Sequence, residues 1–243
     1  MKILSLDSTA LTATVAVCED EHLIGSYTLN TGSTQSETLL PMVESLMKLS
    51  GLEMSDIDMF ACSRGPGSFT GVRIGAATIK GLAFGSDKPC IGVSTLEALA
   101  YHLKELAGSG EAILCPVMNA RRGQVYNALF MVKNGVMSRI CEDRALAISA
   151  LEQELLNYTM PIFFSGDGYD ITVKSLSSLS ASVTPELLRY QNAYSVAMVA
   201  LEKYRDGDRT TDAELSPSYL RLPQAERERN ERLAREAEQK QLK

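Results

Sequence analysis

Short apolar runs alternate with amphipathic segments through the first 107 residues. Each run is bounded by polar or turn-forming residues, which is typical of a buried strand. The predicted strands cover 2–6, 12–17, 23–29, 59–62 and 90–93. The predicted helices cover 35–49, 69–84 and a segment from Ser94 or Thr95 to Leu106. Three strands followed by alternating helices and strands predict one compact α/β layer structure.

The helix predicted over 69–84 is apolar around most of its circumference. Gly65, Pro66 and Gly67 break the preceding strand, and Ser68 or Thr70 is expected to cap the helix. Its apolar residues are Val72, Ile74, Ala76, Ala77, Ile79, Leu82, Ala83 and Phe84. A helix that is apolar on more than one side is covered on more than one side. We therefore expect another domain or another chain to cover the side that its own sheet does not.

The helix predicted over 35–49 is amphipathic and ends at Gly51, a typical C-terminal cap. Its apolar stripe consists of Leu39, Leu40, Val43, Leu46 and Met47. The spacing of these residues fits one face of a helix. Packing on the chain's own sheet and packing on a partner explain this stripe equally well.

The glycine-rich turn at 65–67 invites comparison with phosphate-binding loops. A P-loop requires two glycines separated by four residues and followed by Lys and Ser or Thr, and this spacing is absent here. The glycine triplet of a dinucleotide fingerprint is absent as well. A helix N-terminus can attract an anion, but a structural role for the turn is favoured.

A similar order of elements restarts after Gly108 and Gly110. Strands are predicted over 113–118, 124–133 and 162–164, and helices over 149–156 and 193–204, with turns at 134–135 and 166–168. The repeated order predicts two related lobes, the second degenerate. We expect a first lobe over 1–107, a second over 108–222 and a charged tail over 223–243.

Composition and charge narrow the range of possible functions. The net charge of -6 and a pI near 5.1 argue against a protein that binds nucleic acid without a partner, because such binding requires clustered Lys and Arg. The five cysteines are dispersed and predict neither a disulfide framework nor a zinc site. The start of the chain reads as a strand too short for a signal peptide, and no apolar run approaches the ~20 residues of a membrane span. We expect a cytoplasmic protein that does not contact membranes.

The two histidines, His22 and His102, argue against metal or triad catalysis. A helical metal site places two histidines four residues apart so that they share one face, and neither histidine has such a neighbour. A Ser-His-Asp triad would have to recruit one of them, and no motif nominates a serine nucleophile. We expect no catalytic and no metal-binding residues.

Four segments of the sequence resemble the bacterial TsaB family: ILSLDSTALTATVAV, RGPGSFTGVRIG, ARRGQVYNALF and the terminal PSYLR. The resemblance extends to about Arg221. It implies a two-lobed actin-like ATPase fold (ASKHA, RNase H-like). It also implies a non-catalytic role beside a paralogue, TsaD, which transfers threonylcarbamoyl to the adenosine next to the anticodon of tRNAs that read codons beginning with A.

In that family the helices that match 35–49 and 69–84 form a helical bundle with TsaD. The implied interface residues are Leu39, Leu40, Val43, Leu46, Met47, Val72, Ile74, Ala76, Ala77, Ile79 and Lys80. Where TsaD-type enzymes carry their histidine pair, the matching helix here has Gln35 and Glu37. The resemblance further implies a homodimer of the isolated chain, a TsaE-type ATPase in a larger complex, and contact with tRNA only through that complex.

Nucleotide binding is expected to be weak or absent. Actin-like proteins grip phosphates with two hairpins whose glycines let backbone amides approach closely. The first hairpin here offers Asp7, Ser8 and Thr9 without a glycine, and the second offers Asn119 and Arg121 where the family more often begins with Asp. A missing carboxylate weakens a magnesium site, so we expect no cofactor.

The tail over 224–243 has six basic against five acidic residues. Such a segment is either a solvated helix with weak i,i+4 pairs or disordered, and this reading is favoured over contact with tRNA. Two alternative functions for the chain are less favoured: a small-molecule phosphotransferase of the actin-like type and a metal-independent peptidase.

Overall fold

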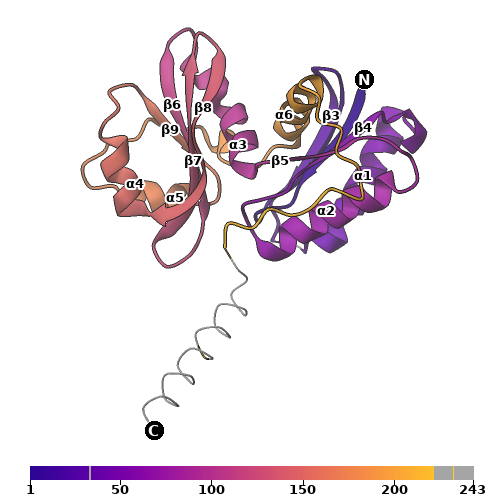
Figure 1. Ribbon diagram of the computed structural model, residues 1–243, viewed down its shortest axis with the longest axis horizontal. Helices are drawn as coiled ribbons and strands as arrows, with labels where there is room; N and C mark the ends of the chain where they lie inside the picture. The colour runs from indigo at the N-terminus through magenta and orange to yellow at the C-terminus, as the bar shows by residue number, and fades with distance from the viewer. Residues whose placement is uncertain (33, 222–231, 233–243) are drawn as a thin grey trace.

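The computed structural model describes residues 1–32, 34–221 and 232. Two lobes lie side by side, each built around one sheet (Figure 1). The strands of the first lobe are β1 (Lys2–Asp7), β2 (Ala13–Glu19), β3 (His22–Leu29), β4 (Met59–Ser63) and β5 (Cys90–Val93). Their order is β3-β2-β1-β4-β5, with antiparallel pairing from β3 to β1 and parallel pairing from β1 to β5.

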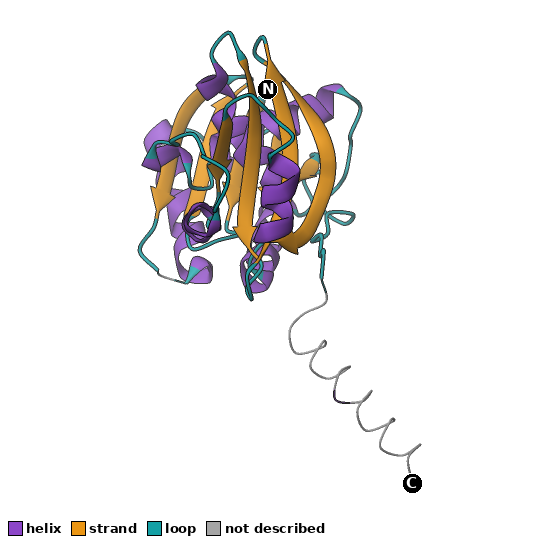
Figure 2. Ribbon diagram, turned by 90° about the vertical axis from the view of Figure 1, so that its left-hand side faces the viewer, coloured by secondary structure: helices purple, strands orange, loops and turns teal. Residues whose placement is uncertain are grey.

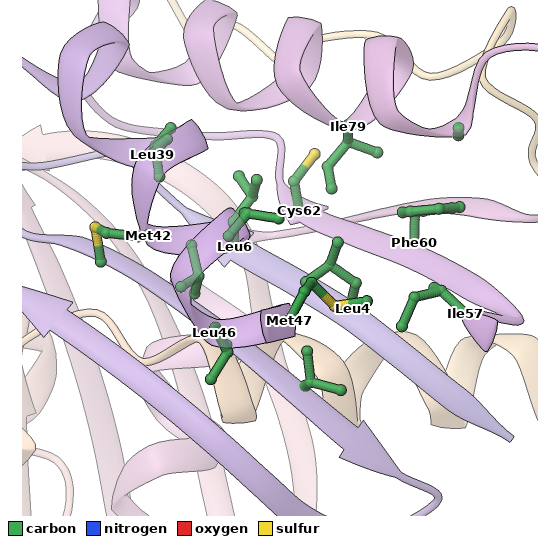
Figure 3. Packing of buried hydrophobic residues seen from close by; sticks show 14 of the residues in the cluster. Leu4, Leu6, Leu39, Met42, Leu46, Met47, Ile57, Phe60, Cys62 and Ile79 are labelled. Carbon is green, nitrogen blue, oxygen red and sulfur yellow. The ribbon is translucent and has the colours of Figure 1, made fainter. Parts of the chain in front are cut away.

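Helices cover both faces of the first sheet because alternate residues of its strands are apolar on both faces. On one face, Leu4 and Leu6 pack with α1 (Gln35–Ser50) and α2 (Phe69–Ala83), as Figure 3 shows. On the other, Ile3 packs against α6 (Ala193–Arg205). Side chains on alternate positions of a strand point to opposite faces, so each strand supplies two cores.

The second lobe repeats this plan with fewer elements. Its strands are β6 (Glu111–Asn119), β7 (Gln124–Lys133), β8 (Val136–Ala147) and β9 (Ile162–Ser165), in the order β8-β7-β6-β9. Its sheet lies between α3 (Thr95–Leu103) on one face and α4 (Ile148–Leu155) with α5 (Tyr169–Ser175) on the other. Figure 2 looks onto this lobe and shows helices packed against the strands. Short 3-10 helices cover Met54–Asp56, Lys104–Ala107 and Glu186–Leu188.

The predicted two-lobed α/β fold with a degenerate second lobe is confirmed. In each lobe an antiparallel three-stranded unit is extended by parallel pairing, through β4 and β5 in the first lobe and through β9 in the second. Beyond β9, the described part of the second lobe adds a single parallel bridge between Phe163 and Ser182. Two such lobes in tandem are the actin-like arrangement.

The predicted helix ends are confirmed as well. Ser68 caps α2 by accepting a hydrogen bond from the Gly71 N–H at 3.3 Å. Ser94 caps α3 by accepting one from the Glu97 N–H at 3.3 Å. Gly51 ends α1 with a φ of 66°. Local chemistry therefore fixes where these helices begin and end.

The predicted extent of the second lobe, 108–222, is wrong at its end. The last helix, α6, packs on β1 and β2 of the first sheet, so the chain returns to the first lobe after α5. The reason is that the inner face of the first sheet would otherwise expose Ile3, Met59 and Ile91, all of which α6 helps to bury.

The expectation that another domain or chain must cover the second side of α2 is also wrong in part. Residues 210–221, which we call the strap, lie along this helix and belong to the same chain (Figure 1). The Lys80 Nζ donates hydrogen bonds to the carbonyl oxygens of Ala213 at 3.3 Å and Leu215 at 3.1 Å. Leu215 is buried in the core of the first lobe. The tail predicted over 223–243 lies outside the described residues, apart from residue 232.

Two glycines of α2 offer a matched test of how closely this helix packs on the first hairpin. A Cβ at Gly71 would collide with the Ser8 carbonyl oxygen, whereas a Cβ at Gly81 meets nothing within 4 Å. We expect Gly71→Ala to lower the free energy of unfolding by about 2–3 kcal/mol. The control, Gly81→Ala, should raise it by about 0.5–1 kcal/mol because alanine is the better helix former. Urea unfolding followed by circular dichroism measures both, and equal effects of the two variants would contradict the packing argument.

Candidate functional site

A cavity of about 490 Å³ lies between the two lobes. Its wall combines the tip of the first hairpin, the glycine turn, the N-terminal end of α2, the β6–β7 hairpin and the strap. The lining residues are Ala10, Leu11, Gln35, Pro66, Gly67, Ser68, Phe69, Thr70, Val72, Asn119, Ala120, Arg121, Tyr126, Asp167, Ser218, Tyr219, Leu220 and Arg221. The tip of the first hairpin and the β6–β7 hairpin therefore both border this cavity.

The polar residues of the first hairpin are buried and engaged within the fold. The Asp7 Oδ1 accepts hydrogen bonds from the Thr9 N–H at 2.8 Å and the Thr9 Oγ1 at 2.7 Å. The Ser8 Oγ donates to the Gly71 carbonyl oxygen at 2.8 Å. Burial raises the pKa of Asp7 above its ordinary value, while the hydrogen bonds from Thr9 oppose the shift. These side chains hold the hairpin to α2 and do not face the cavity.

The glycine turn covers the backbone of the same hairpin. The Ser68 N–H donates to the Thr9 carbonyl oxygen at 2.7 Å, and the Cα of Gly67 packs directly against that oxygen. A phosphate grip requires backbone N–H groups that face an anion. The first hairpin instead presents the carbonyl oxygens of Ser8 and Thr9 to the glycine turn and α2.

The second hairpin places its candidate residues in the cavity wall. The Arg121 N–H donates to the Asn119 Oδ1 at 2.8 Å, and Arg121 has a φ of 64°. The Asn119 N–H donates to the Asp167 Oδ1, also at 2.8 Å. The structure therefore brings Asn119 and Arg121 together at the cavity, apart from the buried Asp7, Ser8 and Thr9.

Asp167 is a cavity residue that the sequence analysis treated only as part of a turn. It lies two residues after the end of β9, between Gly166 and Gly168. Desolvation between the two lobes raises the pKa of Asp167 to about 6, the Asn119 N–H lowers it, and the charge of Asp7 raises it further. Because the side chain keeps solvent-accessible surface along the cavity wall, water there screens part of this shift. An acidic residue at the end of a buried strand was the signal that could have identified it.

The residues predicted to contact a partner divide into two groups. Most have their side chains in the chain's own core, because the apolar stripes of α1 and α2 face the first sheet (Figure 3). The buried ones are Leu39, Val43, Leu46, Met47, Val72, Ala76 and Ile79. The prediction that these side chains lie on a partner surface is therefore wrong, because they are buried in the interior of the chain.

The outer faces of α1 and α2 keep a smaller apolar surface. Leu40 is 52% exposed, Ala77 is exposed and Ile74 is half-buried. Lys80 is half-buried because the strap carbonyls accept its hydrogen bonds. Beyond the predicted set, Leu49 is 75% exposed at the end of α1, and Phe84 is 83% exposed just after α2. A partner can reach these side chains without unfolding either helix.

The two histidines lie on different elements of the fold. His22 opens β3, and His102 lies in α3 with its Nε2 3.3 Å from the Leu187 carbonyl oxygen. Within the described part of the chain, no group of three or more His, Cys, Asp or Glu is placed to hold a metal ion. Nor is any helix described here long and apolar enough to cross a membrane.

A two-lobed fold with this closed first hairpin invites comparison with known proteins. The family model described as TsaD, tRNA N6-adenosine threonylcarbamoyltransferase, matches residues 31–229. The chain belongs to this family. The match reaches both lobes and the strap but begins after the first hairpin, which lines the cavity with Ala10 and Leu11.

Within the TsaD family, the resemblance to TsaB is confirmed. The Bacillus subtilis protein named tRNA threonylcarbamoyladenosine biosynthesis protein TsaB is 28% identical over 230 residues, which are 93% of this chain and 96% of that protein. The Escherichia coli protein of the same name is 36% identical over 137 residues, or 56% of this chain and 58% of that protein.

Solved structures agree with the family and the fold. The structure described as YeaZ from Pseudomonas aeruginosa has a TM-score of 0.76 and 26% sequence identity, and the match covers 90% of this chain and 99% of that one. A second structure from P. aeruginosa, described as similar to peptidase YeaZ, has a TM-score of 0.74 with the same identity and coverage.

The raised pKa of Asp167 predicts how stability depends on pH. Its neutral form favours the fold below its ordinary pKa of 3.8, and this contribution is lost as pH rises through about 6. Asp167→Asn keeps an acceptor for the Asn119 N–H but cannot ionise. We therefore expect the variant to lose less stability than the parent protein between about pH 4 and about pH 7.

Urea unfolding across this pH range measures the difference. Asp170→Asn, three residues away on the exposed side of α5, is the matched control and should follow the parent protein. Parallel pH profiles for Asp167→Asn and the parent protein would show that the cavity does not desolvate this carboxylate.

Proposed function

We propose that this chain is a non-catalytic subunit in the synthesis of threonylcarbamoyladenosine on tRNA. Its partner is a TsaD-type subunit, which carries out the transfer. The curated relatives are named for this pathway, and the family model carries the name of the transferase itself. We place this activity in the cytoplasm.

One observation carries the role of a partner subunit. Leu40 and Ala77 are exposed on helices whose opposite faces are buried in the core of the first lobe. Helices fixed in this way present a rigid surface, so a partner that covers it loses little conformational entropy on binding. The same surface serves a homodimer when the TsaD-type subunit is absent.

Support for a non-catalytic role comes from the polar groups of the first hairpin. Asp7 and Ser8 use their side chains to attach the hairpin to itself and to α2, and His22 and His102 lie on different elements. In the larger assembly a TsaE-type ATPase supplies nucleotide chemistry, and tRNA is contacted through the complex.

The two alternatives differ in what they require of the chain. A phosphotransferase requires a phosphate grip, and the covered backbone of the first hairpin argues against one. A peptidase requires a nucleophile with its base, and the positions of the two histidines provide neither a metal pair nor a triad. Substrate-dependent ATP hydrolysis, or proteolysis that survives replacement of both histidines, would favour these alternatives.

The partner surface is tested by charge substitutions on the outer helix faces. We expect Leu40→Asp and Ala77→Asp each to abolish co-elution with the TsaD-type subunit in size-exclusion chromatography, because each buries an unpaired carboxylate in the interface. Circular dichroism should show a preserved fold, since both positions are solvent-exposed in the monomer.

Leu187→Asp is the matched control for these variants. Leu187 is 85% exposed but lies in the second lobe, away from α1 and α2. This variant should co-elute as the parent protein does. Retained co-elution of both helix variants would overturn the proposed surface.

Weak or absent ATP binding is a separate expectation. Isothermal titration calorimetry of the isolated chain with ATP and Mg²⁺ should give no saturable heat at micromolar concentrations. A Kd in the micromolar range would reverse the expectation and favour the phosphotransferase alternative.

A further inference from the structure

The strap runs antiparallel to α2 and contacts it near both ends. Lys80, in the last turn of the helix, donates hydrogen bonds to the carbonyl oxygens of Ala213 and Leu215. Near the other end, the Arg73 Nε donates to the Tyr219 hydroxyl at 2.8 Å. The guanidinium of Arg73 also lies 3.9 Å from the ring centroid of Phe69, whose ring packs 4.9 Å from that of Tyr219.

Backbone hydrogen bonds attach the strap to the first lobe. The Cys90 N–H donates to the Thr210 carbonyl oxygen at 2.8 Å, and the Ser218 N–H donates to the Arg64 carbonyl oxygen at 2.7 Å. Between these two points, Leu215 is buried and packs against Gly92. The strap is therefore an integral part of the first lobe as far as Ser218.

Three residues later the strap contacts the second lobe. The guanidinium of Arg221 donates to the Ala120 carbonyl oxygen at 3.4 Å and to the Gln124 Oε1. It also lies 5.6 Å from the ring centroid of Tyr126. All of these contacts belong to the β6–β7 hairpin, whose tip carries Arg121. Arg221 therefore connects the strap to the hairpin that faces α2 across the cavity.

The strap also forms one wall of the cavity. Ser218, Tyr219, Leu220 and Arg221 line it together with residues from both lobes. The contacts of Arg221 attach this wall to the second lobe, and without them less would hold the second hairpin near α2.

We propose that the strap is a clasp between the lobes, with Arg221 as the anchor that sets the distance between the β6–β7 hairpin and α2. Hinged two-lobed proteins change shape when a few contacts between their lobes are exchanged. Only two residues separate Ser218, which is bonded to the first lobe, from Arg221, which is bonded to the second. The clasp therefore transmits any displacement of α2 or of Tyr219 to the second hairpin. This inference goes beyond the proposed function and does not depend on the identity of the partner.

Spin-label distance measurements on the full chain test the clasp. Cysteines replace Lys48 on α1 and Gln153 on α4, both exposed and in different lobes, and Cys141, the partly exposed native cysteine, is changed to serine. With Arg221 intact we expect one narrow distance distribution. Arg221→Ala should broaden this distribution and shift its mean by more than about 2 Å, the scale of a domain rearrangement.

Arg209→Ala is the matched control. Arg209 precedes the strap, donates to the carbonyl oxygens of Tyr204 and Asp208, and stacks on Tyr204, all within the first lobe. This variant should leave the distribution unchanged. If Arg221→Ala fails to fold, Gln124→Ala removes an acceptor from the other side of the clasp and should shift the distribution in the same direction.

Two results would overturn the proposal. One is a distribution for Arg221→Ala or Gln124→Ala that is the same as that of the parent protein. The other is an equal shift for Arg209→Ala, because the effect would then follow from loss of any arginine in this region and not from release of the second lobe.

Discussion

The close approach of α2 to the first hairpin is the constraint on which the rest of the structure depends. The backbone of Gly67 and Gly71 lies against the carbonyl oxygens of Thr9 and Ser8, and Gly75 lies against the Ser8 side chain. Residues with a Cβ at the first two positions would hold the helix away from the sheet. With glycine there, α2 sits deep enough to bury Val72, Ala76 and Ile79 in the first core. The outer face of α2 remains for the strap and for the proposed partner beside the strap.

The same approach determines what the polar groups of the first hairpin do. The Ser8 hydroxyl donates to the Gly71 carbonyl oxygen, and the Thr9 carbonyl oxygen accepts from the Ser68 N–H at the start of α2. The carboxylate of the hairpin, Asp7, is buried and bonded to Thr9. These hydrogen bonds stabilise one arrangement of helix and hairpin. The cavity that remains between the lobes is bordered mainly by the second hairpin and the strap.

The strap connects these features. It covers the side of α2 that the sheet leaves open, and it reaches the second lobe through Arg221. The wall of the cavity and the contact between the lobes share this segment of about a dozen residues, and the segment lies along α2, which carries Ala77 of the proposed partner surface. A change in any of the three is expected to reach the others, because the segment is held at both ends by hydrogen bonds.

The sequence by itself determined the local elements. Apolar alternation located most of the strands, and Ser68, Ser94 and Gly51 marked helix ends, because capping depends on neighbours within a few residues. It missed β8, a strand that is half-exposed along its length, and it placed α6 in the wrong lobe. Of the candidate site, Asn119 and Arg121 were predicted, but Asp167 and Arg221 were not. Only the tertiary structure decided that most of the predicted partner residues are core, and that the chain covers its own helix with the strap. A hydrophobic pattern shows that a face is buried, whereas the identity of the segment that buries it depends on contacts between residues more than a hundred positions apart.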